Sequence, residues 1–476
     1  MAESLRKKTI QGVVWSSIER FSLQSIQFII NIIMARLLLP SDYGMIGMLA
    51  IFLQLSQTFV DCGFTNALIQ RKERTETDFS TVFYCNVLIA VVLYAILFFS
   101  APLIAGFYNL PQLTEVTRVI SLNFIFASFS AVHKTKLTIN VDFKTQSKAS
   151  LAAALISGGI GIAAAYTGMG VWALVCQSVL NSLLLTALLC YFVRWRPLLK
   201  FSRQSFNSLF SFGSKLMMAN FINIIYKNLY TLIIGKRFSA VMLGYYTRAE
   251  QFASFPPYNI NAVISRVTYP ILSSIQDDNR RLADAYRKYI QLSSFLIFPL
   301  MVGLTALAEP VIRLLLTEKW MGIVPLLQIL CIAWMYDHIS AINLNLLFVK
   351  GHSDWALKLE FIKKTIATTI LFASIPFGLE GMCWGRVLYS LIATYLNSHY
   401  TKSLIGLSFR QQMKDILPSM TLSFVMGGVV WGISGLIPSS ALQLAAGTCT
   451  GIAFYLLAAW GCKMDSFKEI IKLTRK

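Results

Sequence analysis

The sequence predicts an all-α membrane protein with about fourteen transmembrane helices. Of its 476 residues, 56% are hydrophobic and only 13% are charged, and the mean hydropathy is +0.61. A single soluble core cannot bury so much apolar surface. Apolar windows of about 20 residues, the length that crosses a bilayer, fill most of the chain. Polar residues at helical spacing interrupt several of these windows, and their pattern recurs 200 positions later.

The predicted spans follow one another with short connections. They begin near positions 13, 45, 82, 114, 149, 171, 211, 240, 290, 323, 361, 382, 416 and 442. The first span follows a short basic leader and is longer than the core of a signal peptide, so we expect no cleaved signal. The connections on the predicted outer side have only about 3 to 10 residues. A polysaccharide polymerase or ligase needs a larger outer loop, so the sequence argues against such an enzyme.

The distribution of Lys and Arg predicts the orientation of the spans. The N-terminus, six alternate connections and the C-terminal tail hold 30 of the 42 basic residues. The opposite connections contain only Arg36, Lys236, Arg237 and Lys319. Because cytoplasmic loops retain basic residues, both termini are expected in the cytoplasm. This arrangement also explains the net charge of +20 without a nucleic-acid partner.

Polar stripes mark four of the spans. The first two carry Arg20, Gln24, Gln27 and Asn31, then Gln54, Thr58, Asp61 and Thr65. The corresponding positions about 200 residues later are Asn220, Asn223, Lys227 and Thr231, then Ser254, Tyr258, Asn261 and Ser265. This spacing places each set on one side of a helix. A stripe either lines a hydrated interior or joins packed helices, and we favour the hydrated interior because intramembrane ionisable residues are usually functional.

The stripes belong to a longer internal repeat. Ala35, Arg36 and Gly44 match Gly235, Lys236 and Gly244 at the same offset. Six spans per half predict two parallel lobes, residues 1–198 and 199–410, related by an axis normal to the membrane. Residues 411–476 add two helices and a basic tail. In the eighth span, Pro256 and Pro257 predict a kink or a break.

Catalytic and metal-binding patterns are missing from the sequence. The eight cysteines lie in or beside apolar spans without metal-type spacing, so we interpret them as small hydrophobic residues. HExxH, Walker A and GxSxG motifs do not occur, so we expect no enzyme and no bound metal or cofactor. Asp337 and His338 form either a proton relay or a buried hydrogen-bonded pair.

Several segments resemble bacterial polysaccharide exporters. Residues 35–44 (ARLLLPSDYG) resemble the first-loop signature of that family. Further blocks are similar to its colanic acid exporter branch: DCGFTNALIQRKE at 61–73, Pro256-Pro257 followed by RVTYP at 266–270, IQDD at 275–278, EKW at 318–320 and PLLQILC at 325–331. The resemblance covers roughly residues 1 to 410. It identifies the chain as a member of the polysaccharide transporter group of the multidrug, oligosaccharidyl-lipid and polysaccharide exporter superfamily.

The resemblance implies a function without covalent chemistry. A flippase of this family moves an oligosaccharide repeat unit on undecaprenyl pyrophosphate across the bacterial inner membrane by alternating access between two lobes. Its substrate is a precursor of capsule, exopolysaccharide or lipopolysaccharide. Its partners would be this substrate, membrane lipids and the polysaccharide polymerase machinery. The alternative is an ion-coupled multidrug or metabolite antiporter of the same superfamily, but twelve spans are usual there.

The stripes supply candidate residues for such a substrate. Cations in a hydrated cavity lower the barrier to moving a pyrophosphate, and Arg20, Lys227 and Arg248 are the candidates. Sugar hydroxyls could bind Gln24, Gln27, Asn31, Asn220, Asn223 and Asn261. Glu19, Asp61 and Glu250 are candidates for coupling to H⁺ or Na⁺, although the carboxylates beside arginines could instead form structural ion pairs. Arg36 and Lys236 lie at the predicted outer mouth, where they either attract the anion or cap helix ends.

Overall fold

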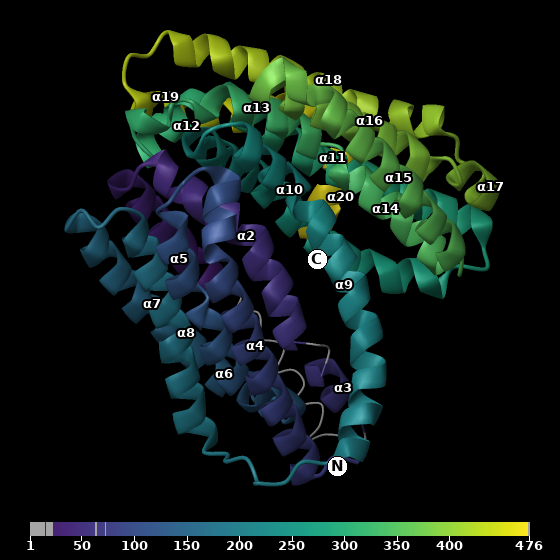
Figure 1. Cartoon of the computed structure of the whole chain (residues 1–476). Helices are drawn as coiled ribbons and strands as arrows, with labels where there is room; N and C mark the ends of the chain where they lie inside the picture. The colour runs from purple at the N-terminus through teal and green to yellow at the C-terminus, as the bar shows by residue number, and fades with distance from the viewer. Residues whose placement is uncertain (1–14, 16–21, 62–63, 72, 475–476) are drawn as a thin grey trace. The chain divides into compact units, whose positions relative to one another are not determined.

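A computed structural model describes residues 15, 22–61, 64–71 and 73–474 of the chain (Figure 1). Every regular element in this described part is a helix. Ten helical segments of the described residues are long and apolar enough to cross a membrane. The all-α membrane fold predicted from the sequence is therefore confirmed.

The chain divides into two compact units, and the division falls between Gly244 and Tyr245. The first unit contains the helix Ser22–Leu37 and then α2 Pro40–Asp61, α3 Phe64–Gln70, α4 Glu76–Tyr108, α5 Leu113–Ile120, α6 Leu122–Ile139, α7 Phe143–Tyr166, α8 Val171–Val193 and α9 Arg203–Arg237. The helix α10, Ala240–Ser274, begins in the first unit and continues into the second.

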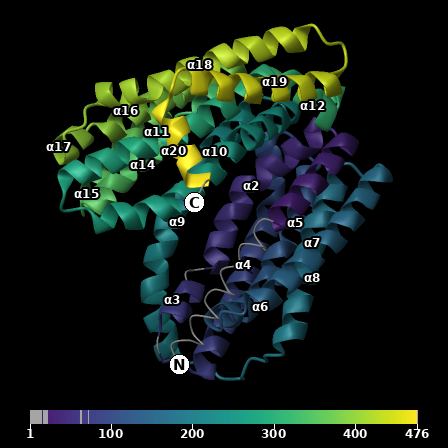
Figure 2. The same ribbon diagram turned by 180° about the vertical axis from the view of Figure 1, so that it is seen from behind.

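The second unit contains the remaining helices. These are α11 Asn279–Ala306, α12 Ala308–Leu315, η1 Glu318–Trp320, α13 Ile323–Trp334, α14 Asp337–Val349, α15 Ser353–Ser374, η2 Ile375–Phe377, α16 Gly378–Ser398, α17 Thr401–Ile405, α18 Phe409–Gly435, α19 Ser440–Gly461 and α20 Asp465–Thr474. The last two long helices, α18 and α19, lie side by side in both views (Figures 1 and 2).

The predicted spans correspond to helices of the described part. The apolar segment Ser353–Ile405 is one of the ten, but it contains two long helices, α15 and α16. The helices α9 and α10 have 35 residues each. Neither is among the ten apolar segments, because polar residues lower their mean hydropathy. These two helices carry the second copy of the polar stripes. A helix of transmembrane length with so many polar residues must cover them with protein or water.

One span in each predicted half is broken in the middle. The span Leu113–Ile139 consists of α5 and α6, which meet at Ser121. The span Ile323–Val349 consists of α13 and α14, which meet at Met335 and Tyr336. Both are fourth spans of their halves, so the break follows the internal repeat. Broken helices in transporters free backbone groups and helix ends for a binding site.

For the eighth span the sequence predicts a kink or a break, and the structure shows no break. The helix α10 continues through Pro256, Pro257 and Pro270. Proline removes one backbone donor but leaves its φ angle helical, so a helix held by neighbours can pass through it. Glycines of the fifth span allow close packing, because a β-carbon on Gly158 would collide with Ile30 and one on Gly161 with Gln177.

Packing within each unit explains where its boundary lies. The helix α9 packs on α2, α3 and α4 of the first unit. The lobe boundary at residue 198, which follows the repeat rather than these contacts, stays a prediction. In the second unit, α18 packs along α11, and Asp415 accepts two hydrogen bonds from Arg287, of 2.7 and 2.6 Å. A bidentate arginine contact of this kind fixes orientation as well as distance.

A buried polar network also joins α18 to the second unit. The Tyr286 hydroxyl donates to Asn343 Oδ1, and Asn343 Nδ2 donates to Gln412 Oε1 at 3.2 Å. Gln412 Nε2 in turn donates to Thr401 Oγ1 at 2.8 Å. Satisfied networks of this type specify one arrangement of helices. The two helices beyond residue 411 are thus an integral part of the second unit.

Candidate substrate-binding site

The first unit presents polar side chains from the apolar helix Ser22–Leu37 and from α9. Gln27, Asn220, Asn223 and Lys227 are exposed, and Gln24 and Asn31 are half-buried. Exposed polar groups on such helices are costly against lipid and therefore favour a hydrated surface. Glu19 and Arg20 lie outside the described residues. Asp61 is the last residue of α2, and its side chain also lies outside the described part.

One predicted stripe residue joins two helices of the first unit. Gln54 on α2 and Asn228 on α9 exchange amide hydrogen bonds: Asn228 Nδ2 donates to Gln54 Oε1 at 3.0 Å, and Gln54 Nε2 donates to Asn228 Oδ1 at 3.5 Å. Asn228 is buried, with 5% of its surface exposed. Side-chain amides commonly hold membrane helices together in this way. At Gln54, the polar stripe of α2 therefore holds two helices together and does not face a hydrated interior.

We expect Asn228→Leu to lower the stability of the first unit by about 1 kcal/mol, because Gln54 loses its amide partner inside the membrane. Thermal unfolding of the purified protein in detergent measures this loss. The double variant with Gln54→Leu should be less destabilised than the sum of the two single variants. Additive losses would show that the two amides do not interact.

The two predicted outer cations lie at helix ends. Arg36 and Lys236 are both exposed. Lys236 donates to the carbonyl oxygen of Phe107 in the last turn of α4, and its Nζ lies 4.5 Å from the centre of the Phe107 ring. A cation at the C-terminal end of a helix is favourable because carbonyl groups there carry partial negative charge. The structure therefore gives Lys236 a capping contact.

A polar cluster in the second unit surrounds the break between α13 and α14. Its centre is the pair of Glu250 on α10 and Arg386 on α16, whose Oε1 and Nη2 atoms are 2.7 Å apart. Trp334 Nε1 donates to the other oxygen of Glu250 at 3.1 Å, and the Arg386 guanidinium lies 5.0 Å from the centre of the Trp334 ring. Arg386 Nη1 also donates to the Tyr246 hydroxyl at 3.1 Å.

Other charged residues of the second unit also have polar partners. Asn261 Nδ2 donates to Asp337 Oδ2 at 3.2 Å, and Asp337 lies within electrostatic range of Arg386 and Lys363. Lys363, only 6% exposed, binds Glu360 on the same helix, α15. Arg248, 8% exposed, donates to Gln251. The cluster mixes both signs of charge, so much of its positive charge is compensated within the protein.

Asp337 and His338 are adjacent but have different partners. Asp337 binds Asn261, whereas Nε2 of the fully buried His338 lies 2.9 Å from Ser294 Oγ. Each side chain is thus held by a neighbouring helix, α10 for Asp337 and α11 for His338. The two residues tie the start of α14 to these helices.

The sequence-based candidates omitted three residues of the cluster. Arg386 lies well inside the twelfth predicted span, and an arginine in such a position is a signal that could have been used. Lys363 is one of the basic residues that the sequence analysis assigns to a cytoplasmic connection, residues 350–364, and Glu360 lies in the same segment. The structure starts α15 at Ser353, which places both residues in its second and third turns. Their burial depends on contacts with other helices, which spacing alone does not reveal.

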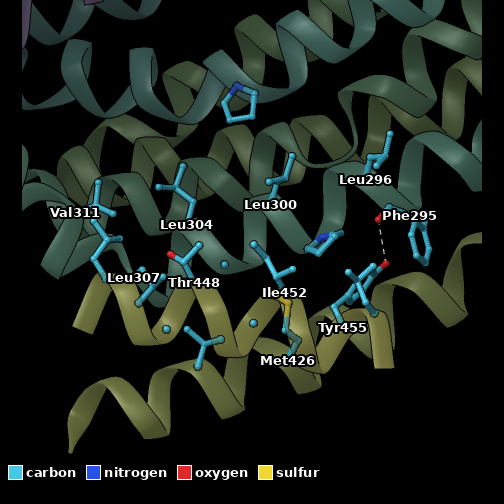
Figure 3. Close-up of a pocket in the computed structure, with 18 residues that line it drawn as sticks. Phe295, Leu296, Leu300, Leu304, Leu307, Val311, Met426, Thr448, Ile452 and Tyr455 are labelled. Atoms are coloured by element: carbon cyan, nitrogen blue, oxygen red, sulfur yellow. Dashed lines mark hydrogen bonds between the residues drawn. The ribbon is translucent and has the colours of Figure 1, made fainter. Parts of the chain in front are cut away.

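An apolar groove of about 500 Å³ runs along α11 and α19 in the second unit (Figure 3). Its walls come from α10, α11, α12, α18 and α19, and they include Leu296, Leu300, Leu304, Leu307, Met426, Ile452 and Tyr455. Three glycines in the walls, Gly303, Gly447 and Gly451, have no side chain and so leave space in the groove. The lining residues of α11 extend from Phe295 to Leu304, a distance of about 14 Å at 1.5 Å per residue. The groove is therefore roughly as long as one leaflet of the hydrocarbon core.

The Tyr455 hydroxyl marks one end of the groove. It donates to the carbonyl oxygen of Phe295 at 3.1 Å, which joins α19 to α11 there (Figure 3). Thr448 places a second hydroxyl among the labelled lining residues, and the leucines, Met426 and Ile452 are apolar. Such a lining suits a long hydrocarbon chain and offers little to a polar ligand.

These features define a class: a multi-pass helical membrane protein with a polar cluster and an apolar groove among its helices. Its fold is similar to that of a solved structure of the lipid II flippase MurJ in an inward closed conformation. The TM-score is 0.72 with 18% sequence identity, covering 96% of this chain and 100% of that one. At this level of identity the similarity shows the fold.

The family model for the polysaccharide biosynthesis protein matches residues 33–325, so the chain belongs to this family. Among similar relatives, the lipopolysaccharide biosynthesis protein WzxC of Escherichia coli is 28% identical over 90% of this chain and 89% of its own length. The teichuronic acid biosynthesis protein TuaB of Bacillus subtilis is 26% identical over 95% of each chain. The resemblance to polysaccharide exporters seen in the sequence is thereby confirmed.

Proposed function

We propose that this protein is a flippase for oligosaccharide repeat units linked to undecaprenyl pyrophosphate. The substrate would be a precursor of capsule, exopolysaccharide or lipopolysaccharide, and it would cross the bacterial inner membrane by alternating access. The observation that carries this proposal is the apolar groove along α11 and α19. A transporter of small water-soluble molecules has no need for an apolar site as long as one bilayer leaflet.

The groove suits a polyprenyl chain because it is long, lined mostly by large apolar side chains, and widened by three glycines, Gly303, Gly447 and Gly451. The two helices that complete it, α18 and α19, lie beyond the twelve spans usual in multidrug antiporters. Burial of each methylene group in such a site contributes about 0.8 kcal/mol. A C55 chain has many such groups, so the groove can hold part of the carrier while the rest stays in the lipid. The relatives act in the synthesis of polymers, as their names say.

The polar residues would serve the other end of the substrate. Arg20, Lys227 and Arg248 are our candidates for the pyrophosphate, and Arg36 and Lys236 for its outer path. The amides Gln24, Gln27, Asn31, Asn220, Asn223 and Asn261 are the candidates for sugar hydroxyls. Of these residues, Lys227, Asn220 and Asn223 are exposed on α9. Amide side chains both donate and accept hydrogen bonds, which suits hydroxyl-rich ligands of varied sequence.

We also propose that a gradient of H⁺ or Na⁺ drives transport, with Glu19, Asp61 and Glu250 as the coupling carboxylates. Glu250 is paired with Arg386, so neutralising its charge would release that arginine. The protein would perform no covalent chemistry itself. It would deliver substrate to the polymerase machinery, and both of its termini would face the cytoplasm.

A bacterium that lacks its own exporter for a defined polysaccharide tests the proposal. We expect the wild-type protein to restore surface polymer, and Arg20→Ala, Lys227→Ala and Arg248→Ala to leave the undecaprenyl-linked precursor on the cytoplasmic leaflet at matched expression. If the wild type leaves the precursor trapped with every glycan tried, the flippase proposal fails. If all three variants work normally, the cationic site is wrong.

A further inference from the structure

A second, smaller pocket lies beside the Tyr455 end of the apolar groove, within the second unit. Its volume is about 260 Å³, and its walls come from Lys288, Gln291 and Leu292 of α11 and from Asp465, Ser466, Lys468 and Glu469 of α20. Lys288, Leu292 and Phe295 are spaced four and three residues apart, so they share one face of α11. Lys288 precedes Phe295 by two helical turns, about 10 Å. The same face of α11 therefore leads from the pocket into the apolar groove, whose lining begins at Phe295.

The C-terminal helix α20 lies against α11 where the pocket meets the groove (Figures 1 and 2). Its Phe467 ring packs on Phe295, with 6.4 Å between the ring centres. Two residues further along α20, Glu469 Oε1 accepts a hydrogen bond from Lys288 Nζ at 3.3 Å. The helix α20 thus places an apolar ring on the end of the groove and a carboxylate on the cation beside it.

These two contacts match the chemistry at the head of a polyprenyl pyrophosphate. In such a lipid, an anionic diphosphate is joined directly to the first isoprene unit. The Lys288 ammonium is a donor for phosphate oxygens, and Phe295 begins an apolar surface for the chain. We infer that Lys288 and the adjoining face of α11 bind the pyrophosphate end of the lipid carrier, and that Phe467 and Glu469 of α20 occupy this site in its place.

The charges on α11 favour an anion at this site once α20 has moved away. Asp415 is compensated by Arg287, which donates two hydrogen bonds to it. Lys288, by contrast, is paired with a carboxylate of α20. Lys468 lies on α20 itself and pairs with Asp465 of the same helix at 3.1 Å. Displacement of α20 would therefore remove the partner of Lys288 and leave its positive charge available to a phosphate.

The contacts that hold α20 on α11 are of a kind that a lipid can replace. The side chains of Lys288 and Glu469 are 60% and 36% exposed, and an exposed ion pair stabilises a structure only weakly. Without α20, the face of α11 from Lys288 to Leu304 would be continuous over about 24 Å. The inference rests on the proposed function, because it assigns a loading site to the same substrate. Arg20, Lys227 and Arg248 stay the candidates for the later passage of the pyrophosphate.

Binding of undecaprenyl pyrophosphate to the purified full-length protein, followed by native mass spectrometry in detergent, tests the site. Lys288→Gln should weaken binding about fivefold, an effect typical of an exposed ionic contact. Phe467→Ala and Glu469→Gln should tighten binding, because they weaken the competing contacts of α20. Opposite shifts from the two partners of one ion pair are the distinguishing result, since loss of a merely structural contact would shift both in the same direction.

Lys358→Gln is the matched control, because it removes the same charge from an exposed position on α15 of the second unit. It should bind like the wild type. Inorganic pyrophosphate and phosphatidylglycerol test the two other sources of a phosphate group. Unchanged binding in Lys288→Gln, weaker binding in Glu469→Gln, or an equal dependence on Lys288 for either of these two probes overturns the site.

Spin labels measure the displacement of α20. Ketone-bearing amino acids carry them at the exposed positions 410 on α18 and 465 on α20, so the native cysteines stay unchanged. We expect their separation to shift with undecaprenyl pyrophosphate and to stay constant with inorganic pyrophosphate. A constant separation with the bound lipid would show that α20 does not occupy its site.

Export of polymer in cells separates this inference from the proposed function. If the wild type exports polymer and Lys288→Gln binds and exports equally well, the site on α11 is wrong and the flippase proposal stands. If binding follows the expected pattern but the wild type exports nothing, the flippase proposal fails and the lipid site stands.

Discussion

Arg386→Ala is expected to abolish export and to destabilise the second unit. Arg386 joins Glu250, Trp334 and Tyr246 around the break between α13 and α14. Removing one partner of a buried ion pair leaves the other charge uncompensated, at a cost of about 3 kcal/mol. Glu250 and Arg386 are 24% and 23% exposed, so water lessens this cost. Surface polymer at matched expression and thermal unfolding in detergent measure the two effects.

The control for this variant is Arg410→Ala, which removes an exposed arginine at the start of α18. It should leave export and stability unchanged. Arg386→Lys should keep part of the activity, because lysine retains the charge but loses the planar donor geometry. The double variant Glu250→Gln with Arg386→Gln should be less unstable than Arg386→Gln alone. If Arg386→Ala exports normally, the cluster has no part in transport.

Filling the apolar groove is expected to stop transport without unfolding the protein. Gly303 lines the groove, and a β-carbon there would lie 3.8 Å from its nearest neighbour, the methyl carbon of Met426. The first atom of a new side chain therefore fits, and Gly303→Leu places its remaining atoms in the space that we assign to the polyprenyl chain. We expect export to fall at least tenfold, which corresponds to about 1.4 kcal/mol of lost binding.

Gly432→Leu is the matched control for the groove. Gly432 lies on α18, outside the groove lining, and a β-carbon there meets nothing within 4 Å. This variant should export at the wild-type rate. Equal thermal stability of the two variants would assign the loss in Gly303→Leu to the occupied groove. Wild-type export by a stable Gly303→Leu variant would show that the substrate chain does not use this groove.

The sequence predicts the helical membrane fold well, because a bilayer requires apolar windows of about 20 residues and these are visible in the sequence. It also predicts the repeat, whose 200-residue offset reappears in the contact between Gly44 and Gly244. Of the kink or break predicted at Pro256 and Pro257, the break is excluded, since α10 is continuous there. The breaks at Ser121 and at Met335 could not be predicted in this way, because no proline stands at either position.

The candidate site was harder to predict, because its geometry depends on contacts between distant residues. Glu250 could be recognised as an intramembrane carboxylate, but its partner Arg386 is 136 positions away. Gln54 could be placed on a polar face, but the sequence does not reveal that Asn228 meets it there. The apolar groove has no polar pattern at all, and only packing of α11, α18 and α19 creates it.

Reconstitution of the purified protein tests the central claim most directly. Vesicles would contain undecaprenyl-pyrophosphate-linked oligosaccharide in both leaflets, and an added glycosidase that cannot cross the membrane would reach only the outer leaflet. With the wild-type protein, we predict that the enzyme digests the inner-leaflet substrate as well, and that Gly303→Leu prevents this. If digestion stops at the outer-leaflet fraction with the wild type, across vesicles with and without H⁺ and Na⁺ gradients, the protein is not a flippase for this class of substrate.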